Sequence, residues 1–158
     1  DDLPDRVFDV AARSGVKAVQ LHGHETARHV AQLSENVRWI LKPVAAGSTE
    51  AARANQYGTD LVLVDAPEPG SGRLFDWKLV DEIPGGLRLI LAGGLTPENV
   101  GSAIDIVKPW GVDVSSGVER SPGRKDPLKV KYFIERARES APEQYLGDDD
   151  LPYDWDDE

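Results

Sequence analysis

The feature that most constrains this 158-residue chain is a strict alternation of five short apolar runs with six helical patterns. The apolar runs are continuous and rich in β-branched residues, which suits strands buried on both faces of a parallel sheet. They are Lys17–His22, Val37–Val44, Asp60–Ala66, Leu87–Ala92 and Trp110–Val114. They begin about 20 to 28 residues apart, the period of a βα unit, so the order predicts a parallel α/β sheet with right-handed crossovers.

Six segments have helical patterns: Leu3–Ser14, Glu25–Ser34, Thr49–Gln56, Asp76–Ile83, Pro97–Val107 and Asp126–Arg138. Most of them place apolar residues three and four positions apart, whereas the third is alanine-rich and the fourth is short. Thr96 is the predicted N-cap of the fifth helix, because Pro97 and Glu98 follow it. The last helix is expected to bury Leu128, Val130, Phe133, Ile134 and Ala137. Residues 1–140 should therefore form one folded unit, and the pattern alone leaves a doubly wound sheet and part of a barrel open.

Acidic residues are concentrated at the end of the chain. The formal net charge is −10, yet seven acids and no base lie in residues 148–158, DDDLPYDWDDE. We expect residues 141–158 to form a disordered, solvated tail, with a docking peptide around Tyr153 and Trp155 as the alternative. The acidity argues against nucleic acid as a partner.

Several classes of function have no signature in the sequence. No apolar run approaches the roughly 18 residues that span a bilayer, and residues 1–5 are unlike a signal peptide, so we expect a cytoplasmic protein without a membrane partner. Three histidines without ligand spacing, and no cysteines, predict no metal site. His24 and His29 are expected on the surface. Nucleotide cofactors have no signature either, since there is no P-loop or GxGxxG motif.

The residues directly after the strands indicate the chemistry, because the C-terminal ends of parallel strands form the active site of such folds. Gly93 and Gly94 precede a helix start, and Ser116 and Gly117 follow the next strand. Glycines that permit close approach, free backbone N–H groups and hydroxyls favour a phosphate site. The alternative for glycines at these positions is simple turn formation.

Three further side chains at strand ends are candidates for a site. Asp65 ends an apolar strand, where partial burial would raise a carboxyl pKa toward the range useful to a general acid; the alternative is an N-cap. Asp113 could orient a substrate hydroxyl or amine, or accept backbone N–H groups in its turn. His22 could contact a ligand or pack at its strand end. The loop of residues 67–72, PEPGSG, could close over a ligand or serve as a connector.

These strand ends, in this order, resemble phosphoribosylanthranilate isomerase, an enzyme of tryptophan biosynthesis. The matching stretches are AVQLHGHE (18–25), LVDAPEPGSGRLFDW (63–77), LAGGLTPENVGSAIDIVKPWGVDVSSGVERSPGRKD (91–126) and the last helix. The resemblance implies a (β/α)₈ TIM barrel, represented here by about five C-terminal βα units. It also implies a cofactor-free Amadori rearrangement of N-(5-phosphoribosyl)anthranilate to 1-(2-carboxyphenylamino)-1-deoxyribulose 5-phosphate.

The resemblance also implies roles for individual residues. Asp65 matches the general acid that protonates the furanose ring oxygen, and Asp113 matches an acidic residue near the anthranilate amine. The phosphate-binding loops after strands seven and eight of the barrel match Gly93, Gly94, Ser116 and Gly117.

The departure from the family is large, because the match begins just before the third helix of the barrel. Strands one to three, with the cysteine that acts as general base and an arginine that contacts substrate, have no counterpart in these residues. We therefore expect the 158 residues alone to be inactive. The missing strands could lie upstream, be absent from a deliberate fragment, or come from a partner chain or a second copy. The functional alternatives are sugar-phosphate binding without catalysis, a half-barrel interaction module that needs a partner chain, and a bifunctional histidine and tryptophan pathway isomerase.

Overall fold

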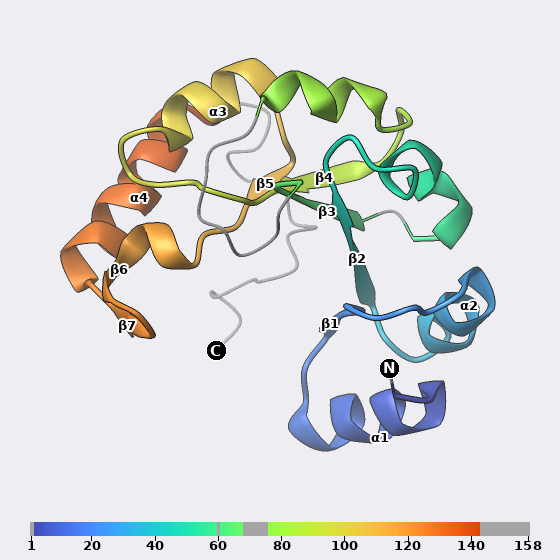
Figure 1. The fold of residues 1–158 in the computed structure, drawn as a ribbon. Helices are drawn as coiled ribbons and strands as arrows, with labels where there is room; N and C mark the ends of the chain where they lie inside the picture. Colours follow the sequence, from blue (N-terminus) through green and yellow to red (C-terminus); the bar gives the residue numbers. More distant parts are fainter. Residues whose placement is uncertain (1, 60, 68–75, 143–158) are drawn as a thin grey trace.

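The computed structural model describes residues 2–59, 61–67 and 76–142. Figure 1 shows the helices in an arc along one side of a parallel sheet, from α1 at one end to α4 at the other. The elements are α1 (Pro4–Ser14), β1 (Ala18–Gln20), α2 (Ala27–Ser34), β2 (Trp39–Ala45), the 3₁₀ helix η1 (Ala51–Tyr57), β3 (Leu61–Asp65), the 3₁₀ helix η2 (Trp77–Glu82), β4 (Arg88–Leu91), α3 (Val100–Val107), β5 (Gly111–Val112), the 3₁₀ helix η3 (Ser116–Val118), β6 (Glu119–Ser121), β7 (Arg124–Lys125) and α4 (Pro127–Glu139).

The five-stranded sheet has the order β1-β2-β3-β4-β5, and every neighbouring pair is parallel. All five predicted strands are confirmed, with ends that differ by a few residues. Because each strand returns to the sheet in the same direction, the residues after all five strands lie at one edge. In the described part of the chain β1 and β5 are the two outer strands, with one neighbour each.

The main core lies between the sheet and the helices that cover it. Val62 and Val64 of the central strand β3 are fully buried, together with Leu91 of β4 and Val100 of α3. A second cluster joins α1 and α2 to β1 and β2, and its members are Ala11, Leu21, Val30, Leu33, Val37 and Ile40. These contacts hold the five strands in fixed register, which places their C-terminal ends next to one another.

Helix boundaries depart from the prediction in several places. The segments predicted as helices over 49–56 and 76–83 form the 3₁₀ helices η1 and η2. Helix α3 begins at Val100 instead of Pro97. The Thr96 hydroxyl still accepts the Glu98 N–H at 3.2 Å, but residues 97–99 form a turn because the Asn99 side chain bonds back to the preceding loop.

The prediction for the buried face of α4 was wrong at two of five positions. Phe133 is buried and Val130 and Ala137 pack against the core, whereas Leu128 is 63% exposed and Ile134 is 44% exposed. The reason is the position of α4 at the end of the arc, where it contacts α3 and η3 and covers them with a single stripe.

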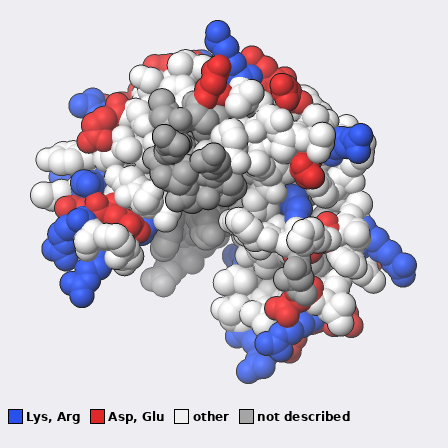
Figure 2. Space-filling model, in the orientation of Figure 1, with Lys and Arg blue, Asp and Glu red and all other residues white. Residues whose placement is uncertain are grey.

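The antiparallel hairpin of β6 and β7 was not predicted, because its strands have three and two residues and no apolar run. The expected tail falls almost entirely outside the described residues, as do residues 68–72 of the predicted closing loop. Among the helices that the structure describes, none has the length and apolarity needed to cross a membrane. Basic and acidic side chains are interspersed over the face of the molecule that Figure 2 shows.

Candidate active site

Asp65 is the last residue of β3 and faces away from the helices. Residues two apart on a strand share a face, so Asp65 lies on the side of Leu61 and Leu63, opposite to Val62 and Val64, which pack in the core. The carboxyl is half-buried, as predicted. One carboxylate oxygen accepts the backbone N–H of Ala66 at 2.7 Å, so the carboxylate also bonds to its own turn.

The loop after β4 lies directly on this turn. Gly93 has a φ of 82°, and a Cβ at this position would overlap the Ala66 nitrogen and come within 2.8 Å of the Asp65 carboxylate. Gly94 follows with a φ of 67°. Asn99 then holds the loop, because its amide donates to the Gly94 carbonyl at 2.9 Å and accepts the Thr96 N–H at 2.8 Å. Gly93 thus has a structural requirement in addition to any role toward a ligand.

The loop after β5 packs closely against the loop after β4, and a glycine again permits the close approach. A Cβ on Gly117 would overlap the carbonyl oxygen of Leu95 and approach its carbon at 2.9 Å. Lys125 of β7 steadies this loop by donating to the Ser115 carbonyl at 2.8 Å and to Glu119 at 3.0 Å. The loops after β4 and β5 therefore form one packed unit, in which Lys125 places a positive charge beside the serines.

Asp113 comes directly after β5, and its N–H donates to the Leu91 carbonyl at 2.8 Å. Burial of the carboxyl raises the pKa of Asp113, and the negative charge of Asp65 raises it further, while Lys125 acts in the opposite direction. The residue as a whole is exposed, so the carboxyl is enclosed on one side only. The two carboxylates therefore face a common space in which Asp113 holds a proton more readily than an ordinary aspartate.

A pocket of about 80 Å³ lies between these loops. Six of the seven predicted site residues line it, namely Asp65, Gly93, Gly94, Asp113, Ser116 and Gly117. A pocket of about 120 Å³ near the start of β2, beside α2, contains none of them. The small pocket therefore unites two carboxylates with two glycine-containing loops. No group of three or more potential metal ligands occurs in the part of the chain that the structure describes.

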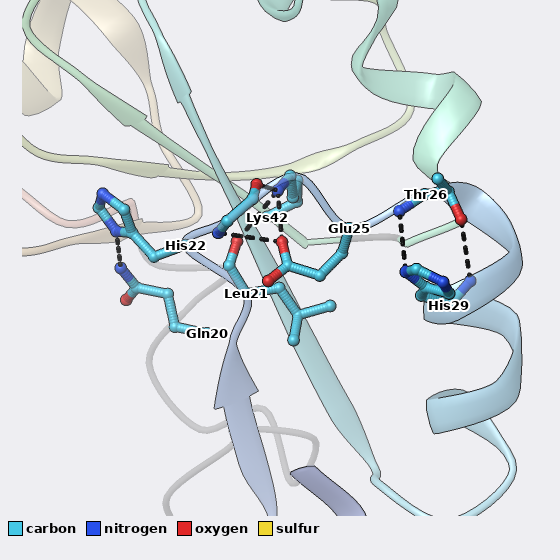
Figure 3. Close-up of polar contacts among 8 residues, drawn as sticks. Gln20, Leu21, His22, Glu25, Thr26, His29 and Lys42 are labelled. Atoms are coloured by element: carbon cyan, nitrogen blue, oxygen red, sulfur yellow. Dashed lines mark hydrogen bonds and ion pairs between the residues drawn. The ribbon is translucent and has the colours of Figure 1, made fainter. Parts of the chain in front are cut away.

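His22 is the one predicted site residue that does not line this pocket. It follows β1 at the same edge of the sheet, is exposed, and its Nδ1 lies 3.3 Å from the Gln20 amide nitrogen. Because β2 separates β1 from β3, His22 lies two strands away from Asp65. Figure 3 shows its ring beside Gln20. His24 is exposed as expected, whereas His29 is half-buried and accepts the Thr26 N–H at the start of α2.

Residues 2–136 match the family model for N-(5'-phosphoribosyl)anthranilate isomerase. The chain belongs to the phosphoribosylanthranilate isomerase family. It is 42% identical over 142 residues to the N-(5'-phosphoribosyl)anthranilate isomerase of Thermotoga maritima, covering 87% of this chain and 69% of that protein. Its identity to the same enzyme of Desulforudis audaxviator is 41% over 144 residues, covering 89% of this chain and 70% of the relative.

Solved structures of phosphoribosylanthranilate isomerases have the same fold. The Thermotoga maritima enzyme superposes with a TM-score of 0.75 at 38% identity, over 88% of this chain and 70% of that one. A phosphoribosylanthranilate isomerase in complex with reduced 1-(o-carboxyphenylamino)-1-deoxyribulose 5-phosphate gives a TM-score of 0.72 at 39% identity, over 88% and 68% of the two chains. The predicted family and the predicted incomplete (β/α)₈ barrel are confirmed.

Four side chains that hold loops of this chain in place were not predicted from the sequence. Asn99 stands three residues after Thr96, at the spacing of a capping box, which was a usable local signal. Lys125 holds Ser115 from ten residues away, and Lys42 forms a buried ion pair with Glu25 across 17 residues. No local pattern indicates contacts at these separations, so only the tertiary structure reveals them.

Because the pKa of Asp113 is raised, we expect the free energy of unfolding to depend on pH. The folded state keeps the Asp113 proton at pH values where the unfolded chain has lost it, so stability falls as pH rises from 3.8 through the raised value. Asp113→Asn removes this loss and should increase the free energy of unfolding at pH 7 by at most about 1 kcal/mol, because solvent screens the exposed carboxyl. At pH values below 3.8 the gain should vanish. Urea unfolding at both pH values measures it.

The control is Asp105→Asn on α3, where the carboxylate is 67% exposed and forms a surface ion pair with Lys108. This variant should unfold at nearly the same urea concentration as the wild type at both pH values. Lower stability of Asp113→Asn at pH 7 would contradict the raised pKa of Asp113, which burial and the charge of Asp65 produce together.

Proposed function

We propose that this chain is the phosphate-binding and acid-supplying part of a phosphoribosylanthranilate isomerase of tryptophan biosynthesis. The reaction is the Amadori rearrangement of N-(5-phosphoribosyl)anthranilate to 1-(2-carboxyphenylamino)-1-deoxyribulose 5-phosphate. The observation that carries the proposal is the pocket in which Asp65 and Asp113 face the two interlocked loops. A family member that binds the reduced product supports the choice of ligand. The cytoplasmic location and the absence of a cofactor stay predictions.

The phosphate is assigned to the loops after β4 and β5. The backbone at Gly93 and Gly94 has the positive φ values that turn N–H groups toward one side of a loop, and Ser116 and Gly117 line the same pocket. Neutral N–H and hydroxyl donors bind a phosphate dianion well when a positive charge lies nearby. Lys125, which contacts the Ser115 hydroxyl at 3.3 Å, is such a charge, and its ion pair with Glu119 offsets part of it.

The acid step is assigned to Asp65. Its proton moves to the furanose ring oxygen as the bond between C1 and that oxygen breaks, and the anthranilate nitrogen lone pair forms the C1=N double bond. A base then removes the C2 proton, which gives an enolamine that tautomerises to the ketone. Asp113 lies close enough to Asp65 for the negative charge of Asp65 to contribute to its raised pKa, and we place Asp113 near the anthranilate amine. The geometry supports both roles because the carboxylates share one pocket with the phosphate loops.

The base is the missing part of this mechanism. The resemblance implies a cysteine on the first strand of the barrel, and the 158 residues contain no cysteine. This observation favours a second candidate function, in which the chain binds the sugar phosphate without turning it over.

Apolar side chains are exposed at both ends of the helical arc. In the α1 region, Leu3 is 74% exposed and Val10 is 52% exposed. In α4, Leu128 is 63% exposed and Tyr132 is 54% exposed. This exposure supports the idea that further βα units cover both ends.

Calorimetry and a turnover assay distinguish the two functions. The chain should bind the reduced product more tightly than inorganic phosphate, and should show no turnover alone. Adding strands one to three and the two helices between them from the Thermotoga maritima relative, as a separate polypeptide, should restore turnover; we call this mixture the complemented enzyme. Binding without restored turnover supports the binding-only function. Absence of phosphate-dependent binding would contradict both.

A further inference from the structure

A buried ion pair lies beside the β1 end of the sheet, outside the pocket that contains Asp65. Lys42 of β2 is 5% exposed, and its ammonium donates to the Glu25 carboxylate at 2.9 Å. The same ammonium donates to the carbonyls of Leu21 at 3.2 Å and Gly23 at 2.6 Å, and it lies 5.6 Å from the centre of the Tyr57 ring. Three acceptors match the three protons of a lysine, so the buried charge is fully paired.

Glu25 completes the network from the other side. Its side chain is 10% exposed, and the carboxylate that pairs with Lys42 also accepts the Gly23 N–H at 3.0 Å. Burial acts to raise the pKa of Glu25, but the hydrogen bond and charge of Lys42, with backbone N–H groups, outweigh it and lower the pKa. The Glu25 carboxyl is therefore ionised at neutral pH.

The groups that this network holds are the backbone atoms on either side of His22. Strand β1 ends at Gln20, and the Leu21 N–H makes a last bond to the Leu41 carbonyl at 2.9 Å. Beyond that point Lys42 and Glu25 hold the two carbonyls that flank His22 and the N–H of the next residue. Figure 3 shows the His22 ring on one side of this segment and Glu25 on the other.

A contribution to folding stability does not by itself explain why the chain has this buried ion pair. An ion pair taken out of water contributes little compared with apolar side chains of the same size, because desolvation offsets the attraction. The pair instead fixes the backbone conformation, because three hydrogen bonds from one ammonium restrain the segment from Leu21 to Glu25. The end of a short outer strand would otherwise have few contacts that fix it.

We propose that Lys42 and Glu25 are positioning residues that fix the backbone around His22, so that its imidazole faces the part of the ligand remote from the phosphate. This inference depends on the proposed function for its ligand. The phosphate loops follow β4 and β5, whereas His22 follows β1, at the other end of the sheet. A ligand anchored by its phosphate therefore meets His22 with its sugar or aromatic end.

The test replaces the ion pair by apolar side chains of similar size, in the double variant Lys42→Met/Glu25→Leu, which leaves no unpaired buried charge. Amide hydrogen exchange measured by NMR on the whole chain should be at least about tenfold faster at Gly23 than in the wild type, because its acceptor is gone. The amides of Val62 and Val64 in the core should exchange as in the wild type, which controls for folding. Unchanged protection of Gly23 would overturn the proposal whether or not the chain binds a ligand.

Ligand binding gives a second readout that a purely structural role would leave unchanged. His22→Ala and the ion-pair variant should each weaken binding of the reduced product by about tenfold, the effect of losing one hydrogen bond of ordinary strength. Their combination should weaken binding no further, because both act through His22. Affinity for inorganic phosphate should stay the same in all variants. Additive losses, or full affinity in the ion-pair variant, would contradict the proposal.

The two proposals fail in different ways. If the wild-type chain binds the reduced product no more tightly than phosphate, the proposed function is wrong, and exchange at Gly23 still decides the role of the ion pair. If the wild type binds the product and only His22→Ala weakens it, the proposed function stands and the positioning role is wrong.

Discussion

Asp65→Asn is expected to lower turnover of the complemented enzyme by about 10²- to 10⁴-fold, the contribution of a general acid. The asparagine amide has nearly the same shape and still accepts a hydrogen bond, so the contact with the Ala66 N–H can persist. It cannot transfer a proton to the furanose ring oxygen, and ring opening becomes the slow step. Steady-state kinetics with N-(5-phosphoribosyl)anthranilate measure the loss.

The loss should appear in kcat and leave binding of the reduced product nearly unchanged, because the variant removes an interaction made in the transition state. Asp105→Asn, on the exposed surface of α3, is the matched control and should retain wild-type turnover. Full activity of Asp65→Asn would rule out Asp65 as the acid. Asp113→Asn in the same assay then tests the neighbouring carboxyl, whose raised pKa makes it the other candidate proton donor.

Gly117→Ala is expected to abolish measurable phosphate binding and to destabilise the fold by about 1–3 kcal/mol, the usual cost of overpacking. The added Cβ would overlap the carbonyl oxygen of Leu95, which is backbone, so one of the two loops must shift. Either shift separates Ser116 from Gly94 in the pocket that both line. Urea unfolding measures the stability, and calorimetry with inorganic phosphate measures the binding.

Gly85→Ala is the control for the chemical change itself. A Cβ on Gly85 meets nothing within 4 Å, and its φ is not in the left-handed region, so this variant should unfold at the wild-type urea concentration or slightly above it. Gly93→Ala would be a less clean test, because its φ of 82° adds backbone strain to the overlap with Ala66. Unaltered phosphate affinity in Gly117→Ala would contradict the placement of the phosphate between these loops.

The strands were predictable because their signal is local. Leu61 to Asp65 is a continuous apolar run closed by a carboxylate, and the structure places it as the central strand. The helix boundaries were harder to predict. Thr96 and Pro97 form a good signal for the start of a helix, and yet α3 begins at Val100. There the Asn99 side chain bonds to Gly94 and Thr96, and this local competition holds residues 97–99 in a turn.

The exposed residues of α4 show why burial could not be predicted from periodicity alone. Leu128 and Ile134 fit an apolar helical stripe, and periodicity assigns every member of such a stripe to the core. In the structure both are exposed, because α4 has packed neighbours on one side only. The sequence pattern reports what a side chain prefers, whereas its burial depends on which elements are present to cover it.

The sequence by itself determined the order of the strands and helices and which residues stand at the strand ends. In a parallel sheet that information brings Asp65, Gly93 and Asp113 to one edge without further knowledge, because each crossover returns the chain in the same direction. Only the tertiary structure decided that Gly117 lies against Leu95 and that Lys42 holds the backbone on both sides of His22. These contacts join residues about 20 positions apart, and their geometry depends on how the loops and strands pack, for which the chain carries no local signal.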